Sequence, residues 1–381
     1  METINEIVLM DKIYEIEQKA LKETGIKVNN ISHWDSSPLF QYQMNKVLVL
    51  PKEISPWNYN YSYSIPESHR KKLLLTLGTI SSLNTVPIVF PSSTISIVNV
   101  LNLLSKLGKK KLCILQPSYF SIAPCCKQFG ISYDTEYITF DINGMHIPFE
   151  EIVQNKYDCV WITNPIYSSG LILDKQCIEQ LLLIRENGIM LIFDESLMIP
   201  GYEVARHIDF DPHTIAIYSP HKAISMNGIK FSVILCNNCH EDFFDHWIDV
   251  FSGGLASSNI VALYHYLSDN YYSGCYMQYK SYTEKLFYDI KKITASFSSV
   301  YTYPKCVGHY MNIFTSKHFN NIEQLINFIE NINFRFHTSI IPGIASGYNK
   351  NSSFNFRINL TGDSERLPHD LYKVLEQITK N

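Results

Sequence analysis

Short apolar runs alternate with amphipathic stretches between about residues 86 and 237. The runs are five or six residues long and rich in β-branched side chains: VPIVF (86–90), KLCILQ (111–116), CVWIT (159–163), MLIFD (190–194), TIAIY (214–218) and FSVILC (231–236). Because they lack the two-residue alternation of a half-exposed strand, we expect strands that are covered on both faces. Several intervening stretches have helical periodicity, among them TISIVNVLNLLSKLG (94–108) and DKQCIEQLLLIRENG (174–188). The pattern predicts an α/β domain with a mostly parallel, mixed sheet and helices on both faces.

The pattern changes after about residue 265. A long polar and aromatic helical stretch is followed by predicted strands and helices: YTYPKCVGHYMNIFT (301–315), NIEQLINFIENI (321–332), FNFRINL (354–360) and DLYKVLEQITK (370–380). We therefore expect a large α/β domain at 46–265 and a smaller α+β domain at 266–381. Residues 1–45 are helical at first and precede the sheet, so we expect them to join the smaller domain.

Composition and charge narrow the class of protein. The chain has 381 residues, of which 46% are hydrophobic and 18% charged, which suits one large or two ordinary globular domains. A net charge of -4 and the lack of a basic stripe argue against nucleic-acid binding. The N-terminus lacks a signal pattern, and no apolar run reaches membrane-spanning length. Nine cysteines without framework spacing favour a reduced, cytoplasmic protein.

One short motif points elsewhere. CNNCH (236–240) matches the C-x-x-C-H pattern of c-type haem attachment. That chemistry requires export, which the N-terminal sequence does not support. We favour a strand that runs into a polar turn, and we expect no metal site.

Polar residues follow the predicted strands at the points where they end. PSST (91–94) comes after the first strand and opens a helix, so Ser92, Ser93 and Thr94 are candidates either for helix capping or for phosphate binding. The later strands are followed by Tyr119, by NPIYSSG (164–170), by Asp194 and by SPHK (219–222). Because ligands of α/β sheets bind beyond the carboxyl ends of the strands, these residues predict one pocket.

Their order resembles that of the fold-type I, pyridoxal 5'-phosphate-dependent aminotransferases of class I/II. The family's N-P-x-N-P-T-G is similar to 164–170, its D-E to 194–195, and its S-x-[ST/H]-K to 219–222, with Gly228 and Lys230 continuing the spacing. The resemblance covers roughly residues 45 to 365. It implies a PLP-dependent transferase fold, the cofactor pyridoxal 5'-phosphate, and a homodimer with its sites at the subunit interface. It also implies transfer of the amino group of an L-amino acid to a 2-oxo acid.

The resemblance further implies a role for each residue. Lys222 would form a Schiff base with the cofactor and move the substrate's α-proton, and Asp194 would keep the pyridine nitrogen protonated. Tyr119 would stack on the cofactor, and Arg357 would grip the substrate α-carboxylate. The phosphate would be bound by the following residues: Ser92, Ser93, Thr94, Ser219 and Lys230. The alternatives are a helix-capping aspartate, a core tyrosine and an arginine in a surface ion pair.

Three departures from the family stand out. Tyr167 occupies the place of the asparagine that contacts the cofactor's phenolic oxygen, and Leu197 that of the usual tyrosine partner. We hypothesise that the Tyr167 hydroxyl replaces both, which adds it to the catalytic and cofactor-binding residues. Lys230 stands in place of an arginine, and Ser93 in place of a glycine. A tyrosine from the partner subunit, Tyr59 or Tyr61, would reach the phosphate.

These departures leave the reaction type open. The first reading is an aminotransferase; the second is other PLP-dependent chemistry on amino acids, as a decarboxylase, lyase, cyclase or oxidase. The third is a member of this fold that binds a ligand without turnover. The sequence does not identify the amino acid.

Overall fold

The computed structural model describes residues 6–32, 37–45, 65–79, 84–141, 144–349 and 353–380. The chain divides into two compact units. We call residues 47–167 and 172–277 the sheet unit, and residues 1–46, 168–171 and 278–381 the terminal unit.

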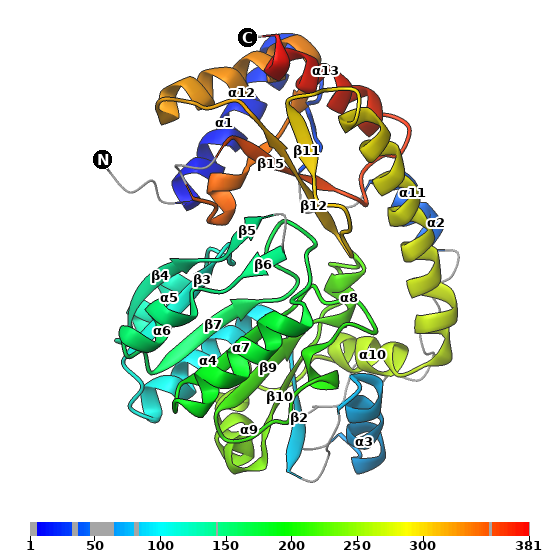
Figure 1. Cartoon of the computed structure of the whole chain (residues 1–381). Helices are drawn as coiled ribbons and strands as arrows, with labels where there is room; N and C mark the ends of the chain where they lie inside the picture. Colours follow the sequence, from blue (N-terminus) through cyan, green and yellow to red (C-terminus); the bar gives the residue numbers. More distant parts are fainter. Residues whose placement is uncertain are drawn as a thin grey trace. The chain divides into compact units, whose positions relative to one another are not determined.

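A seven-stranded sheet forms the centre of the sheet unit (Figure 1). In spatial order its strands are β2 (Thr85–Phe90), β10 (Ser232–Asn237), β9 (Thr214–Tyr218), β8 (Met190–Glu195), β7 (Cys159–Thr163), β3 (Lys111–Gln116) and β4 (Ser132–Tyr137). β10 is antiparallel to both of its neighbours, and the other pairs are parallel. The sheet is therefore mostly parallel and mixed, as predicted.

Six of these strands coincide with the predicted apolar runs, whereas β4 was not predicted. Every residue of β7, β8, β9 and β10 is buried, as expected for strands covered on both faces. β4 has the sequence SYDTEY and no fully buried residue. As an edge strand with one neighbour it can remain polar, so it lacks the apolar pattern on which the prediction relied.

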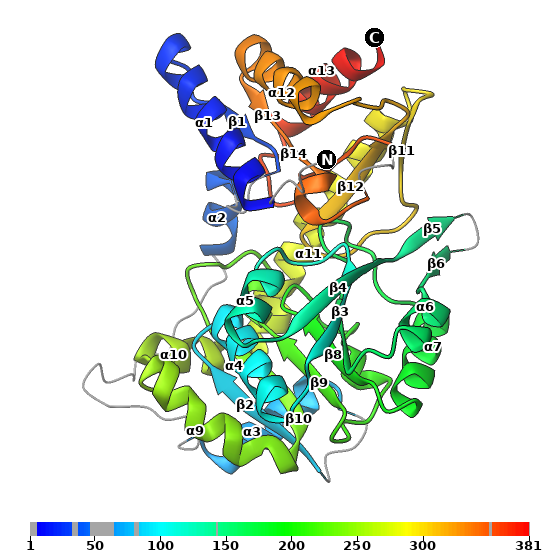
Figure 2. The same cartoon turned by 90° about the vertical axis from the view of Figure 1, so that its left-hand side faces the viewer.

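Helices cover both faces of this sheet (Figure 2). α4 (Ser93–Lys106) and α5 (Ile122–Gln128) lie on one face, and α6 (Phe149–Gln154) and α7 (Lys175–Glu186) on the other. Further helices complete the unit: α3 (Glu67–Thr76), α8 (Pro220–Ala223), α9 (Glu241–Ser252), α10 (Ser257–Tyr266), the 3-10 turns η2 (Val204–Arg206) and η3 (Asn238–His240), and the π-helix η4 (Tyr271–Tyr276). A hairpin of β5 (Thr139–Asp141) and β6 (Gly144–His146) stands apart from the main sheet.

The terminal unit is an α+β structure. Its antiparallel sheet has the order β11 (Val300–Thr302), β12 (Tyr310–Thr315), β15 (Asn355–Asn359) and β14 (Ile341–Pro342), and β1 (Asn29–Asn30) pairs in parallel with β13 (Thr338–Ser339). Its helices are α1 (Glu6–Thr24), α2 (Pro38–Asn45), α11 (Met277–Thr294), α12 (Ile322–Phe336), α13 (Leu367–Thr379) and the 3-10 turn η5 (Gly343–Ser346). The N-terminal residues join the C-terminal ones because α1 packs against α12 and the β1–β13 pair links the two segments.

The fold settles the reading of one sequence motif, CNNCH. Cys236 is fully buried in β10, and the chain then turns into η3, so CNNCH is a strand followed by a polar turn, as predicted. The His240 ring lies 3.0 Å from the Pro212 carbonyl oxygen through Nε2. No helix in the described part of the chain is long and apolar enough to cross a membrane.

Candidate active site

Four of the predicted residues lie at one edge of the seven-stranded sheet. β3, β7, β8 and β9 are parallel and adjacent, so their carboxyl ends lie at the same edge. The segments that follow β3, β7 and β9 contain Tyr119, Tyr167 and Lys222, and Asp194 is the next-to-last residue of β8 itself. This is the edge at which α/β sheets bind their ligands.

Lys222 lies on α8, the single helical turn that follows β9. Its Nζ is 3.5 Å from the hydroxyl of Ser93 and 5.3 Å from the centre of the Tyr119 ring. Burial lowers the pKa of Lys222; the charge of Asp194 opposes this effect, and that of Lys230 adds to it. A lysine whose pKa is lowered is neutral, and therefore nucleophilic, in a larger fraction of molecules at neutral pH.

The charge of Asp194 acts on the Lys222 amine. Burial raises the pKa of this carboxyl group, while the hydrogen bond from Ser196 and the charge of Lys222 lower it. One of its oxygens accepts hydrogen bonds from the Ser196 hydroxyl at 2.6 Å and from the Ser196 backbone N–H at 3.1 Å. The charge of Asp194 also raises the pKa of Tyr119, after the larger effect of burial. Lys222, Asp194 and Tyr119 thus lie within electrostatic reach of one another.

Glu195, the next residue, is held by a different set of groups. Its carboxylate accepts hydrogen bonds from Asn164 Nδ2 and, at 3.0 and 3.1 Å, from the Val204 backbone N–H, and it interacts electrostatically with Tyr218. Burial raises the pKa of Glu195 to about 8, against the opposing effect of these donors. Successive side chains of a strand point to opposite faces, so Asp194 and Glu195 serve different surroundings.

Asn164 belongs to this second network. Its Nδ2 donates to Glu195, and its Oδ1 accepts the Leu173 backbone N–H at 3.1 Å. The Asn164 side chain, at the start of NPIYSSG, is therefore occupied by internal hydrogen bonds. The sequence does not indicate the hydrogen bond between Asn164 and Glu195, although it shows an Asn-Pro and an Asp-Glu pair at neighbouring strand ends.

The residues of PSST have separate surroundings at the N-terminus of α4. Ser92 is the N-cap, and its hydroxyl accepts the Ile95 backbone N–H at 3.4 Å, which satisfies the capping alternative at that position. Ser93 is buried with its hydroxyl toward Lys222, and Thr94 is exposed. The free N–H groups and the dipole of this 14-residue helix attract anions.

Ser219 and Lys230 frame the other side of the lysine turn. The buried Ser219 hydroxyl donates to the Phe231 carbonyl at 3.0 Å, and the Lys230 side chain is exposed. Asn259, which the sequence did not single out, donates through Nδ2 to the carbonyl oxygens of Pro91 (3.2 Å) and Lys230 (2.6 Å). It therefore ties the segment before α4 to the segment that carries Lys230.

The two predicted aromatic residues lie next to each other. The rings of Tyr119 and Tyr167 meet edge to face with centroids 5.9 Å apart. Tyr167 is 4% exposed, whereas Tyr119 is half-buried. The Tyr119 ring is the one that Lys222 Nζ approaches.

Arg357 lies in the terminal unit, on β15, and is 2% exposed, which excludes a surface ion pair. Its Nε donates to the Ser32 carbonyl at 2.9 Å, and one terminal nitrogen donates to the Ser168 hydroxyl at 3.3 Å. The guanidinium carbon lies 4.7 Å from the centre of the Tyr310 ring. The Ser168 hydroxyl in turn donates to Ser346 at 2.8 Å.

Gly170 is the one residue of NPIYSSG for which the backbone demands glycine. Its φ is +70°, and a Cβ there would lie 2.3 Å from the Tyr310 carbonyl oxygen. By contrast, Ser93, at the place of the family's glycine, is not among the described residues with positive φ. Its backbone is helical, so a serine fits without strain.

Tyr59 and Tyr61 lie outside the described residues. Among the residues that are described, no group of three or more His, Cys, Asp or Glu side chains could hold a metal ion. The nine other predicted cofactor-binding and catalytic positions all belong to the sheet unit.

The donor set fits a phosphorylated pyridine aldehyde. It combines an amine of lowered pKa, a buried carboxyl group beside it, an aromatic ring, a helix N-terminus and a second cation. The first three would bind an aldehyde, a ring nitrogen and a ring face, and the last two would bind a phosphate.

The sequence matches no family model and shows no significant similarity to a curated protein. Solved structures do match. They include an archaeal alanine:glyoxylate aminotransferase (17% identity, TM-score 0.77, covering 97% of this chain and 96% of that one) and the multiple substrate aminotransferase of Thermococcus profundus (12%, 0.76, 96% and 94%). A third is MppP, soaked with the product 2-ketoarginine (18%, 0.67, 92% and 100%). The predicted fold class is confirmed: over nearly its whole length, the chain has the fold of these aminotransferases.

Proposed function

We propose that the protein is a PLP-dependent aminotransferase that moves the amino group of an L-amino acid to a 2-oxo acid. The observation that supports this best is the placement of Lys222, which is half-buried, has a lowered pKa and lies within electrostatic reach of Asp194 and near the Tyr119 ring. The names of its structural neighbours also favour amino-group transfer over the other PLP-dependent reactions, because they include alanine:glyoxylate, methionine, kynurenine and aspartate aminotransferases.

Pyridoxal 5'-phosphate, when bound, supplies an aldehyde and an electron-withdrawing ring. Lys222 would hold the aldehyde and later accept and return the substrate's α-proton, which its lowered pKa favours. Asp194 would hold a proton on the ring nitrogen. A cation at that position would lower the pKa of Asp194 and keep its carboxylate ionised.

The phosphate would lie at the N-terminus of α4. Ser93, Thr94 and the backbone of Ser92 would donate to it, Ser219 would border it, and Lys230 would supply a mobile positive charge. Lysine binds phosphate as a point charge without the paired donors of arginine, so Lys230 gives less orientation. Tyr119 would stack on the ring.

Two residues would complete the site. The Tyr167 hydroxyl would donate to the phenolic oxygen of the cofactor, a role that Asn164 is not placed to fill because its amide serves Glu195 and Leu173. Arg357 would bind the substrate carboxylate through its planar fork of donors. We also propose a cytoplasmic homodimer in which Tyr59 or Tyr61 of one copy reaches the other's phosphate.

The test begins with cofactor binding. The purified chain is mixed with pyridoxal 5'-phosphate, reduced with borohydride and digested, and we expect mass spectrometry to locate the label on Lys222. Lys222→Ala should lose both the label and the visible absorbance of the lysine-bound cofactor. If the wild-type chain acquires neither, the proposed function is wrong.

The reaction type is tested next. The holoenzyme is incubated with pooled amino acids and 2-oxo acids, and products are identified by mass spectrometry. Appearance of a new amino acid and its matching 2-oxo acid is expected. Release of carbon dioxide, ammonia or peroxide instead would replace transamination with the corresponding lyase, decarboxylase or oxidase chemistry.

A further inference from the structure

The helical turn that carries Lys222 is too short to fix its own orientation. α8 spans four residues, Pro220 to Ala223, and a helix of one turn has little stability by itself. Its backbone is bonded locally, since the Lys222 carbonyl accepts the Ser225 N–H at 3.0 Å. The direction of the Lys222 side chain must therefore depend on what packs behind the turn.

The group behind the turn is His221, the residue before the lysine. Its side chain is fully buried, and its Nε2 lies 2.9 Å from Nδ1 of His265, at the end of α10. The rings of Phe231 and Tyr271 contact it edge to face, at centroid distances of 5.4 and 5.5 Å. Successive helical residues project in different directions, so an anchored His221 fixes the side on which Lys222 emerges.

The hydrogen-bond network assigns a direction to the histidine pair. Asn270 Nδ2, a donor only, is 3.4 Å from His265 Nε2, and the Cys275 thiol is 3.6 Å from the same nitrogen. His265 Nε2 is therefore the acceptor, so His265 Nδ1–H donates to His221 Nε2. Burial and His265 lower the pKa of His221 to about 3, and burial lowers that of His265, so both rings are neutral.

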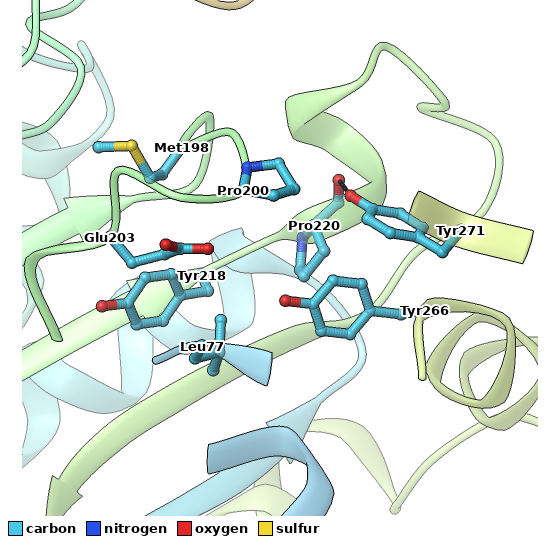
Figure 3. Close-up of a pocket in the computed structure, with 8 residues that line it drawn as sticks. All are labelled: Leu77, Met198, Pro200, Glu203, Tyr218, Pro220, Tyr266 and Tyr271. Atoms are coloured by element: carbon cyan, nitrogen blue, oxygen red, sulfur yellow. Dashed lines mark hydrogen bonds between the residues drawn. The ribbon is translucent and has the colours of Figure 1, made fainter. Parts of the chain in front are cut away.

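A second contact holds the same turn. The Tyr271 hydroxyl donates to the Pro220 carbonyl at 2.8 Å, and Figure 3 shows it directed at that proline. Tyr271 begins η4, and a π-helical turn of this kind frequently marks a functional site. Pro220 and Tyr271 both line the small cavity drawn in Figure 3, which has room for about one water molecule.

The helix that supplies His265 is itself fixed to the proposed phosphate segments. Asn259, in the first turn of α10, bonds to the backbone of Pro91 and Lys230. One helix therefore contacts the lysine turn at its last turn and the phosphate segments at its first. A rigid helix between these contacts would set the position of the amine relative to the phosphate.

We propose that His265 is a positioning residue that acts through its hydrogen bond to His221 and, with Tyr271, sets the direction and surroundings of the Lys222 amine. The inference rests on the proposed function, since it assigns His265 a purpose in presenting that amine to a cofactor. Neither histidine contacts the reacting atoms in this role.

The decisive comparison is between His265→Asn and His265→Leu. The amide nitrogen of asparagine can take the place of Nδ1 and donate to His221, whereas leucine fills similar space without a donor. His240→Leu is the matched control, because it also removes a buried, hydrogen-bonded histidine from the sheet unit. Asp194, Lys230 and Tyr119, which act on Lys222 electrostatically or through ring contact, are unchanged in all three variants.

The readout needs no cofactor. In the cofactor-free chain, the rate at which an amine-selective acylating reagent labels Lys222 is followed against pH by peptide mass spectrometry, which gives the titration midpoint of that amine. We expect His265→Leu to raise the midpoint by about one pH unit toward that of an exposed lysine. His265→Asn and His240→Leu should keep the wild-type midpoint. Tyr271→Phe, which keeps the ring, should shift it in the same direction by less.

Activity supplies the second readout. In the holoenzyme, His265→Leu should lower kcat by about 10- to 100-fold and change KM by less than about threefold. Equal midpoints for His265→Leu and His240→Leu would overturn the inference, as would a His265→Asn chain that behaves like His265→Leu. If the wild-type chain fails to bind the cofactor while the midpoint still shifts, the proposed function is wrong and the positioning of the amine stands.

Discussion

Asp194 and Glu195 are neighbours on β8, both buried and both with a raised pKa, yet their surroundings differ. Glu195 accepts hydrogen bonds from donors in two other segments, which hold it in one arrangement. The hydrogen bonds described for the Asp194 carboxylate come from Ser196 alone, and its charge acts on a lysine of lowered pKa. A buried acid that is held by several donors stabilises a fold, whereas one near a lysine of lowered pKa suggests chemistry.

The contrast is tested most strongly at Asp194. Asp194→Asn keeps the shape and an acceptor for Ser196 but cannot hold a proton on a ring nitrogen, so we expect a loss of about 10³- to 10⁴-fold in kcat/KM. The free energy of unfolding at pH 8 should not fall, because the buried carboxylate that is removed is unfavourable to ionise. Turnover and thermal unfolding check the two parts.

Asp209→Asn is the matched control, since Asp209 is exposed in the same unit. It should leave both measurements unchanged. If Asp194→Asn lost as much free energy of unfolding as the free energy that corresponds to its loss of kcat/KM, Asp194 would be a structural acid like Glu195.

The ionisation of Glu195 should affect the pH dependence of the free energy of unfolding. A carboxyl group whose pKa rises to about 8 in the folded state binds its proton more tightly than in the unfolded state, so its contribution is present at low pH and declines as the pH rises to about 8. Glu195→Gln stays neutral. Relative to wild type, its free energy of unfolding should therefore improve by about 3 to 5 kcal/mol between pH 4.5 and pH 8.5. Denaturant unfolding across this range measures the difference; parallel curves would contradict the assigned ionisation.

The sequence could predict the candidate site residues that lie at the ends of strands. It could not predict the buried residues that hold them in place. Asp194 and Lys222 follow apolar runs, and the order of strands alone places such residues at one edge. Glu195, Asn259 and His265 act through partners far along the chain, and nothing local marks those pairings. β4 could not be predicted either, because a solvated edge strand has no apolar pattern.

Removing the Tyr167 hydroxyl should have a smaller effect on the proposed site than Asp194→Asn. Tyr167→Phe keeps the ring contact with Tyr119 but removes the hydroxyl proposed for the cofactor's phenolic oxygen. Losing a hydrogen bond to a charged oxygen should raise the pH midpoint of the visible absorbance change of the lysine-bound cofactor by about one unit.

Tyr157→Phe provides the control for that change. Tyr157 is also buried, and its hydroxyl donates to Glu136 at 3.2 Å, so its loss affects a tyrosine of the same unit outside the proposed site. An unaltered titration in Tyr167→Phe would leave the phenolic oxygen to another donor and remove Tyr167 from the site.

The smallest expected effects separate two adjacent serines by the same logic. The Ser92 hydroxyl caps α4, so Ser92→Ala should cost about 1 kcal/mol of unfolding free energy. The Ser93 hydroxyl lies 3.5 Å from Lys222 Nζ, which is long for a hydrogen bond, so Ser93→Ala should leave the free energy of unfolding unchanged. It should weaken cofactor binding by about threefold, as expected for the loss of one modest hydrogen bond. Cofactor titration and denaturant unfolding on both variants test the pair. If Ser92→Ala weakened cofactor binding more than Ser93→Ala did, the phosphate would be bound by Ser92. Capping and phosphate binding would then both belong to Ser92, instead of being divided between the two serines.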